Sequence, residues 1–210
     1  MAIAPEIERA VEVYDPRAQI SPFQIRMIVG VVAQHRFAAR FLIHGCGFDS
    51  RFWHTLNAHG RTLFVEYDEA WASRVRDQAP NLEVTAYPAL PTSVEQSTPR
   101  VDSEALDGVA MPDWAQEAWD IVLIDGPMGY QPQHPGRALP IFWASKTPQA
   151  KADIFVDDYD RPLERLYCDT LLSVDSRPSA ILPGHQGKQM YWRMGGLGAS
   201  TAILPGRQGR

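Results

Sequence analysis

The feature that most constrains the fold of this chain is a series of short apolar runs separated by helical patterns. Runs of this kind are typical of strands that are buried on both faces of a parallel sheet. Their alternation with helices predicts an α/β fold, Rossmann-like, with a mostly parallel sheet. The five runs are Phe41–His44, Thr62–Glu66, Leu82–Ala86, Asp120–Asp125 and Asp153–Asp157.

Two helical patterns precede the first of these runs. Residues 5–13 mix charged and apolar positions, and the segment 14–16 ends that pattern with a proline. Ser21 then predicts the start of a second helix, because it is followed by a proline and by Gln24, which completes a capping box. We expect residues 1–20 to form an N-terminal helical lid over a binding site.

The C-terminal part predicts an antiparallel hairpin that completes the sheet, with arms at 180–182 and 189–194. The tail 195–210 is rich in Gly and small residues, and we expect it to be loose. The connection 87–119 contains four prolines, and its length is typical of a functional lid or a disordered insert. Because no internal repeat is present, we expect residues 1–210 to form a single domain.

Composition limits the classes of partner. The net charge of −5 provides no basic surface for nucleic acid, and no Lys/Arg run indicates binding to a membrane surface. No stretch is apolar enough to span a membrane, the N-terminus does not resemble a signal peptide, and two cysteines make no disulfide framework. We therefore expect a cytoplasmic protein that binds a small molecule. Its oligomeric state stays open.

A glycine-rich turn, Gly45-Cys46-Gly47-Phe48-Asp49-Ser50, follows the first run directly. In an open α/β sheet, ligands bind beyond the carboxyl ends of the strands. Glycines there allow a tight turn and a close approach of the backbone to a ligand, and Cys46 would present its backbone to it. The spacing is only G-x-G, because Ser50 stands where a dinucleotide-binding fingerprint has its third glycine.

Glu66 ends the second run, about 20 residues after the turn. In nucleotide-binding folds an acid at this place accepts hydrogen bonds from ribose hydroxyls, and otherwise it is a solvated acid at a strand end. We favour ribose binding. The missing third glycine removes the cradle for a pyrophosphate, which favours S-adenosylmethionine (SAM) over NAD as the ligand.

Asp125-Gly126-Pro127 ends the fourth run at the same edge of the sheet. A carboxylate there is suited to bind the ammonium group of a methionine moiety or to act as a base, and the alternative is a turn cap. We assign Asp125 and Gly126 to the SAM site. Tyr130 lies in the loop that follows, where packing is less demanding and contact with substrate is feasible.

Several blocks in the same order resemble the polysaccharide-biosynthesis domain of plant glucuronoxylan 4-O-methyltransferases. Phe41–Trp53, FLIHGCGFDSRFW, resembles that family's strand followed by G-x-G-x-D-S and an aromatic residue. Residues 56–71 resemble its L-N, H-G-G-R-T, F-L-E and W run. Asp120–Arg137 resembles its D-x-I-x-V-D-A-P-x-G-Y…P-G-R block, and Asp153–Arg161 resembles its D-V-F-V-H-D-V-x-R block.

The resemblance implies the class I SAM-dependent methyltransferase fold. It also implies that the Asp125–Tyr130 block lines the reaction centre and that a divalent metal takes part in methyl transfer. The SAM contacts that it implies are Gly45, Gly47, Asp49, Ser50 and Glu66.

The chain departs from that family at Asp157, where the family has His. The pair Asp157-Asp158 is a candidate carboxylate site for a hard divalent cation. A solvent-facing acidic turn is the interpretation that we favour, so no metal site is assigned. Arg137 is either a carboxylate-binding residue or a surface arginine at a helix start.

The chain also resembles the bacterial azetidine-2-carboxylate synthases, small relatives of methyltransferases that use SAM as their only substrate. In these enzymes the amine of SAM attacks its own γ-carbon, and methylthioadenosine is released. The reaction needs a proton acceptor for the amine, which Asp125 or Tyr130 would supply. It also needs aromatic faces near the sulfonium and exclusion of water.

We therefore expect a SAM-consuming enzyme and favour cyclisation of SAM to azetidine-2-carboxylate, with Asp125 and Tyr130 as catalytic residues. The short chain, the lack of an acceptor-binding lobe and the many aromatic residues motivate this choice. One alternative is methyl transfer to an oxygen of a small molecule or sugar. The other is a SAM-binding module without catalytic activity.

Overall fold

The computed structural model describes residues 5–14, 20–87, 92–146, 152–172, 179–184 and 187–193. Within these residues, seven strands form one sheet in the order β3-β2-β1-β4-β5-β7-β6. The neighbouring pairs from β3 to β5 are parallel, and β7 runs antiparallel to both β5 and β6. The strands are β1 (Arg40–His44), β2 (Arg61–Glu66), β3 (Glu83–Ala86), β4 (Ile121–Ile124), β5 (Asp153–Val156), β6 (Ala180–Pro183) and β7 (Lys188–Arg193).

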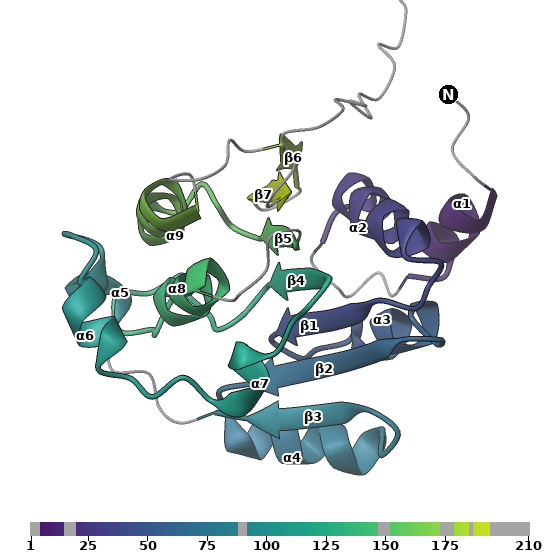
Figure 1. The fold of residues 1–210 in the computed structure, drawn as a ribbon, viewed down its shortest axis with the longest axis horizontal. Coiled ribbons are helices and arrows are strands. Elements are labelled where there is room, and N and C mark those ends of the chain that lie inside the picture. The colour runs from purple at the N-terminus through teal and green to yellow at the C-terminus, as the bar shows by residue number, and fades with distance from the viewer. Residues whose placement is uncertain are drawn as a thin grey trace, which may run out of the picture.

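Helices cover both faces of the sheet, as Figure 1 shows. On one face, α2 and α3 pack over a core, and on the other face α8 and α9 do so. The helices are α1 (Pro5–Glu12), α2 (Pro22–Gln34), α3 (Ser50–Leu56), α4 (Glu69–Gln78), α5 (Val94–Ser97), α6 (Ser103–Asp107), α7 (Asp113–Gln116), α8 (Ala138–Lys146) and α9 (Pro162–Tyr167), with the π-helical turn η1 (Cys168–Leu172) after α9.

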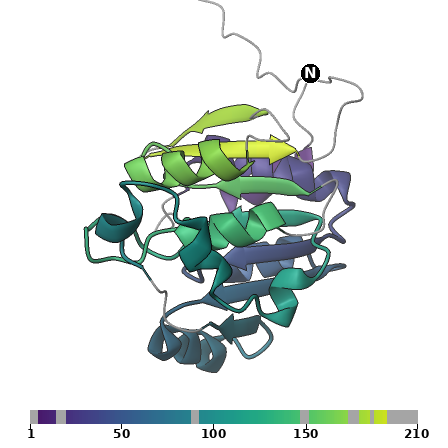
Figure 2. The same cartoon turned by 60° about the vertical axis from the view of Figure 1, so that its left-hand side comes forward.

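The central strands are buried on both faces because their side chains alternate between the two cores. In β1, Phe41 and Ile43 face the core under α2, and Leu42 faces the core under α8. All four residues of β4 are buried. The α/β fold with a mostly parallel sheet and a C-terminal antiparallel hairpin is therefore confirmed. Figure 2 shows the hairpin at one edge of the sheet and α4 with β3 at the other.

The start of α2 is confirmed as a capping box. The Ser21 hydroxyl accepts a hydrogen bond from the backbone N–H of Gln24 at 3.3 Å, and the Gln24 side chain accepts one from the Ser21 N–H at 2.7 Å. These two bonds satisfy donors that a helix start leaves unpaired. They also fix the direction in which the chain leaves the N-terminal segment.

The connection after β3 is a packed element over residues 92–119, whereas 88–91 lie outside the described residues. It contains α5, α6 and α7, and it buries Leu106, Ala115 and Trp119 in the core under α8. A disordered insert is therefore the wrong expectation for this part. The predicted tail 195–210 and residues 15–19 of the predicted lid lie outside the described residues. Among the described helices, none is long and apolar enough to cross a membrane.

Candidate active site

The strand order reverses between β1 and β4, and the glycine turn lies at this switch point. Gly45 has φ +104°, a conformation that L side chains rarely adopt. A Cβ on Gly45 would lie 3.1 Å from the Gly126 nitrogen, and a Cβ on Gly126 would lie 2.9 Å from the Gly45 Cα. The two backbones therefore touch only because both residues are glycines. The structure brings the turn and the end of β4 together, as the sequence predicts.

Side chains hold the glycine turn in shape from inside the molecule. The Gly47 N–H donates to the Ser50 hydroxyl at 2.9 Å, and Ser50, the first residue of α3, is buried. Ser50 thus closes the turn at the start of the helix.

Glu66 lies at the end of β2 and ties that strand to the turn. Its carboxylate accepts hydrogen bonds from the backbone N–H groups of Cys46 at 3.1 Å, Tyr67 at 2.8 Å and Asp68 at 3.1 Å. The side chain is buried, so the solvated strand-end acid is the wrong alternative. Burial and the Glu66 carboxylate raise the pKa of the Cys46 thiol, which therefore stays protonated and is no nucleophile.

Asp49 joins the turn to the N-terminal segment. Its Oδ2 accepts a hydrogen bond from the Tyr14 hydroxyl at 3.0 Å and another from the Trp53 indole N–H at 2.8 Å. Burial and the carboxylates of Asp49, Asp125 and Asp157 raise the pKa of Tyr14. The Tyr14 hydroxyl thus faces the acids at the carboxyl ends of β4 and β5. This part of the predicted lid lies against the turn.

Three carboxylates surround the buried guanidinium of Arg137. Its Nη2 lies 3.3 Å from Asp125 Oδ1 and 2.8 Å from Asp158 Oδ2, and its Nη1 lies 3.9 Å from Asp157 Oδ2. The Arg137 side chain is 4% exposed, those of Asp157 and Asp158 are 13% and 11% exposed, and that of Asp125 is 34% exposed. The solvent-facing acidic turn and the surface arginine are therefore wrong expectations. We call these four residues the acid cluster.

The charges of the acid cluster do not balance, because three carboxylates share one guanidinium. Burial and the neighbouring Asp157 raise the pKa of Asp125 well above its usual range, and Arg137 opposes the shift. Burial also raises the pKa of Asp157, again against Arg137. The two carboxyls are neighbours and ionisation of one opposes ionisation of the other, so the pair holds a proton more firmly than an ordinary aspartate does. A raised pKa also makes the ionised carboxylate a stronger base.

The guanidinium occupies the space between the carboxylates that the sequence offers as a cation site. Within the described part of the chain, no group of three or more His, Cys, Asp or Glu side chains is arranged to hold a metal ion. Asp157 and Asp158 both form ion pairs with Arg137. Asp158 Oδ2 also lies 2.8 Å from Arg161 Nη2.

Tyr130 lies in the loop between β4 and α8, and it is 66% exposed. Its ring packs edge-on against His134, with the ring centroids 4.3 Å apart. Burial, Glu66, Asp68 and Tyr130 raise the pKa of Tyr67, the residue after Glu66, to about 12. Tyr130 lies at the surface of the β4–α8 loop.

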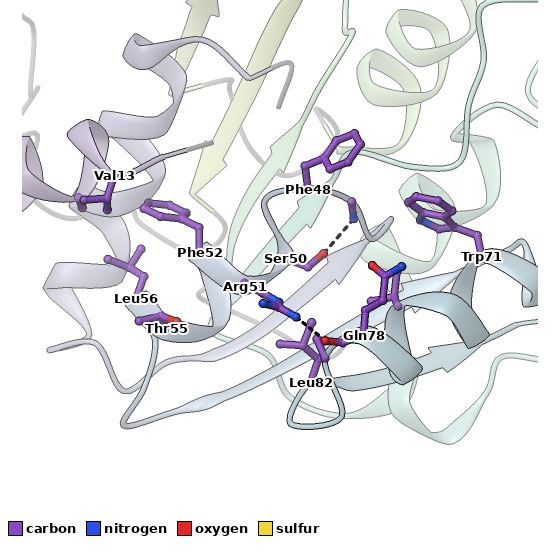
Figure 3. Close-up of a pocket in the computed structure, with 14 residues that line it drawn as sticks. Val13, Phe48, Ser50, Arg51, Phe52, Thr55, Leu56, Trp71, Gln78 and Leu82 are labelled. Carbon is purple, nitrogen blue, oxygen red and sulfur yellow. Dashed lines mark hydrogen bonds between the residues drawn. The ribbon is translucent and has the colours of Figure 1, made fainter. Parts of the chain in front are cut away.

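A groove of about 750 Å³ lies on the outer side of the glycine turn, between α1, α3 and α4 (Figure 3). Its walls are mostly apolar, with Phe48 and Trp71 at the end nearer the turn and Arg51 bound to the Gln78 carbonyl. Arg51 is the one ionisable residue among those that line it. Because this groove holds no acid or base, the chemistry of the site belongs to the acid cluster instead.

Two residues of the site, Tyr14 and Gln24, make contacts that local sequence patterns do not predict. The Tyr14 hydroxyl binds Asp49, which is 35 residues away in the sequence. Gln24, which caps α2, donates from its Nε2 to Asp157 Oδ1 at 3.4 Å, and these two residues are 133 positions apart.

The sequence left Arg137 open between a carboxylate-binding residue and a surface arginine. Its carboxylates, Asp125 and Asp158, follow β4 and β5 of the same chain. The sequence signal for Arg137 and for Arg161 was that the two family-like blocks, Asp120–Arg137 and Asp153–Arg161, each end at an arginine.

The strand order, the switch-point turn and the terminal antiparallel hairpin define the class I methyltransferase fold. A solved methyltransferase from Geobacter sulfurreducens shares this fold, with a TM-score of 0.50 over 92% of each chain. Its sequence is 12% identical, so this likeness concerns the fold alone.

A family model described as IRX15/IRX15L/GXM matches residues 23–102 and 93–180. Glucuronoxylan 4-O-methyltransferase 2 of Arabidopsis thaliana is 33% identical over 172 residues, which cover 70% of this chain and 59% of that protein. Arabinogalactan O-methyltransferase 2 of the same plant is 26% identical over 167 residues, covering 67% of this chain and 57% of that protein. The chain belongs to the IRX15/IRX15L/GXM family. It spans little more than half the length of these relatives.

Proposed function

We propose that this chain is a SAM-dependent O-methyltransferase that acts on a hydroxyl group of a carbohydrate. Membership of the family supports this function, because relatives in it are named as O-methyltransferases of glucuronoxylan and arabinogalactan. The observation that carries the proposal is the acid cluster, which places the Asp125 carboxyl, a base strengthened by its surroundings, beside the glycine turn.

The residues around the turn fit SAM. Gly45 and Gly126 let the turn and the end of β4 approach each other closely at the switch point. Glu66 would accept hydrogen bonds from the ribose, and Asp49 and Asp125 would attract the ammonium group. When bound, SAM supplies an electrophilic methyl group on a positively charged sulfur.

The acid cluster supplies the base that methyl transfer to oxygen requires. A neutral hydroxyl is a weak nucleophile, so its proton must leave as the new C–O bond forms. In our proposal Asp125 takes that proton, and Asp157 shares it. Arg137 keeps both carboxyls in place and limits how far their pKa values rise. Tyr14 fixes Asp49 and covers this edge of the turn, which limits access of water.

From the sequence alone, SAM cyclisation was the favoured reaction and methyl transfer was an alternative. The relatives support methyl transfer better than cyclisation. The proteins compared above are named as methyltransferases, and nothing in them points to azetidine-2-carboxylate. One reason for preferring cyclisation was the expectation that no lobe would bind an acceptor. The packed insert 92–119 weakens that reason, because it builds an additional wall beside the site.

The test is to incubate the protein with SAM and a glucuronoxylan oligosaccharide without methyl groups, and to measure S-adenosylhomocysteine. The variant Asp125→Asn should lower kcat by about 10²- to 10⁴-fold, because it removes the base. Asp113→Asn, an exposed aspartate at the start of α7, is the matched control and should leave kcat unchanged. Binding of SAM without turnover on carbohydrate acceptors would contradict the proposal and favour a non-catalytic module.

A further inference from the structure

A second groove, of about 550 Å³, adjoins the acid cluster, because Arg161 on its wall binds Asp158 and Glu164 on its wall contacts Arg137. Three elements build it: the start of α5, the β4–α8 loop and the start of α9. The insert is tied to the loop by backbone hydrogen bonds from Val94 to the His134 carbonyl at 2.8 Å and from Glu95 to the Pro132 carbonyl at 3.0 Å. The groove walls are thus joined, although they come from distant parts of the chain.

Glu164 is a buried carboxylate on the wall of this groove. Its relative exposure is 0%, and its Oε2 has no hydrogen-bond partner within the described residues. The other oxygen, Oε1, accepts a long hydrogen bond of 3.4 Å from the Arg137 N–H. A buried carboxylate oxygen without a partner is costly, so a donor from outside the chain is the expected complement.

Gly129 lets the backbone of the β4–α8 loop approach this carboxylate closely. A Cβ at this position would lie 2.9 Å from Glu164 Oε1 and 3.5 Å from Arg161 Nη1. A larger residue would therefore push the loop away from these two charged groups. Arg161 uses Nη2 to bind Asp158 at 2.8 Å and is 29% exposed, so it also links the groove to the acid cluster.

Tyr130 adds an aromatic surface at the same place. It lines the groove, it is 66% exposed, and the packing of its ring on His134 holds it in position. An aromatic ring with an open face beside hydrogen-bonding groups is suited to a ligand that is both apolar and polar, as a pyranose ring is.

We propose that this groove binds the acceptor, with a pyranose unit stacked on Tyr130 and one of its hydroxyls donating to Glu164. The proposal rests on the proposed function and deepens it, because Arg137 is in contact with both Glu164 and Asp125. A sugar held by Glu164 therefore lies one side chain away from the base. Glu164 in this role is a specificity-determining residue, and Asp125 remains the catalytic one.

The test measures binding separately from turnover. The full chain, saturated with S-adenosylhomocysteine, is mixed with a glucuronoxylan oligosaccharide, and saturation-transfer NMR detects which sugar protons touch the protein. We expect Glu164→Gln and Tyr130→Ala each to weaken binding by about 10- to 100-fold, the range for a hydrogen bond to a charged group. The controls Glu104→Gln and Ile181→Ala, both at exposed positions outside the groove, should bind as the unchanged protein does.

The outcomes separate this inference from the function on which it rests. Unchanged oligosaccharide binding in both groove variants would overturn the acceptor groove, even if methyl transfer is observed. Binding that the groove variants abolish, without any methyl transfer, would instead overturn the proposed function. A purely structural role for Glu164 would lower the affinity for S-adenosylhomocysteine and the melting temperature as well, and that result would also overturn the inference.

Discussion

At the scale of single residues, Arg137 connects the proposed base, its neighbouring carboxylates and the proposed acceptor groove. Its guanidinium lies against Asp125 and Asp158, and its backbone N–H reaches Glu164. A buried charge network of this kind is stable only while it is complete, since removal of one partner leaves the others desolvated and uncompensated.

The variant Arg137→Gln should therefore lower the free energy of unfolding by about 3–5 kcal/mol, the range for breaking a buried ion pair. Urea unfolding of the two proteins at neutral pH measures the difference. The matched control is Arg100→Gln, whose side chain is 80% exposed and pairs with Asp102 at 3.6 Å. It should change the stability little. A loss in Arg137→Gln as small as that of the control would contradict the arrangement of the acid cluster.

The pH dependence of activity tests the acid pair. Burial and Asp157 raise the pKa of Asp125, so the base is protonated at low pH and kcat should rise as the pH passes that raised value. In Asp157→Asn the neighbouring carboxylate is gone, so this acid limb should move to lower pH. Asp160→Asn, in the same turn but outside the cluster, is the control. An acid limb that stays in place in Asp157→Asn would rule out the pair as the titrating group.

The same shift has a consequence for stability. A carboxyl whose pKa is raised by folding contributes stability at low pH, and that contribution is lost as the pH rises through the raised pKa. Asp125 and Asp157 are such groups. The stability difference between the unchanged protein and Asp157→Asn should thus depend on pH over this interval.

At the scale of elements, the N-terminal segment after α1 contributes directly to the site through Tyr14. The variant Tyr14→Phe removes the hydroxyl that binds Asp49 but keeps the ring contacts with Phe52 and Trp53. The affinity for SAM should fall by about tenfold, as expected for one hydrogen bond that positions a charged group. Calorimetric titration with SAM measures this loss.

Tyr159→Phe is the control for that experiment, since its hydroxyl also binds an aspartate, Asp169, at 2.7 Å, but away from the glycine turn. Its SAM affinity should be unchanged. If Tyr14→Phe also binds SAM as tightly as the unchanged protein, the segment after α1 does not shape the site.

The insert makes a prediction of its own. Leu106 in α6 is 1% exposed and belongs to the core under α8. Leu106→Ala should lower the free energy of unfolding by about 2–5 kcal/mol, as for other buried leucines. Ile181→Ala, at a position that is 56% exposed, should cost far less. Equal stability of the two variants would mean that residues 92–119 are a loose cover over the sheet.

The elements themselves could be predicted largely from local patterns. The five parallel strands, the hairpin and the capping box of α2 all follow from runs and caps that involve neighbouring residues. The insert could not be predicted in this way, because α5, α6 and α7 are short, and burial of Leu106 and Trp119 against the sheet, not a periodic pattern, holds them.

At the scale of the whole molecule, the sequence predicts where the site lies better than how its charges are arranged. The glycine turn, Glu66 and Asp125 meet because all follow strands at the same edge of the sheet. The contacts of Arg137 with β4 and β5, and of Tyr14 with Asp49, depend on tertiary packing that no local pattern records.

The two grooves differ in the ionisable residues that line them. The groove of about 750 Å³ has Arg51 alone among its lining residues, whereas the groove of about 550 Å³ has Glu95, Arg161 and Glu164 beside Tyr130. An acceptor with several hydroxyls fits the second groove better, and that groove adjoins the acid cluster. In our proposal the glycine turn holds the methyl donor, and the second groove holds the methyl acceptor.

The most direct test of the central claim is to follow the methyl group itself. The protein is incubated with SAM that carries a deuterated methyl group, with and without a glucuronoxylan oligosaccharide, and the products are identified by mass spectrometry. The account predicts labelled oligosaccharide together with S-adenosylhomocysteine, and neither product without the oligosaccharide. Methylthioadenosine and an azetidine product formed from SAM alone would contradict it.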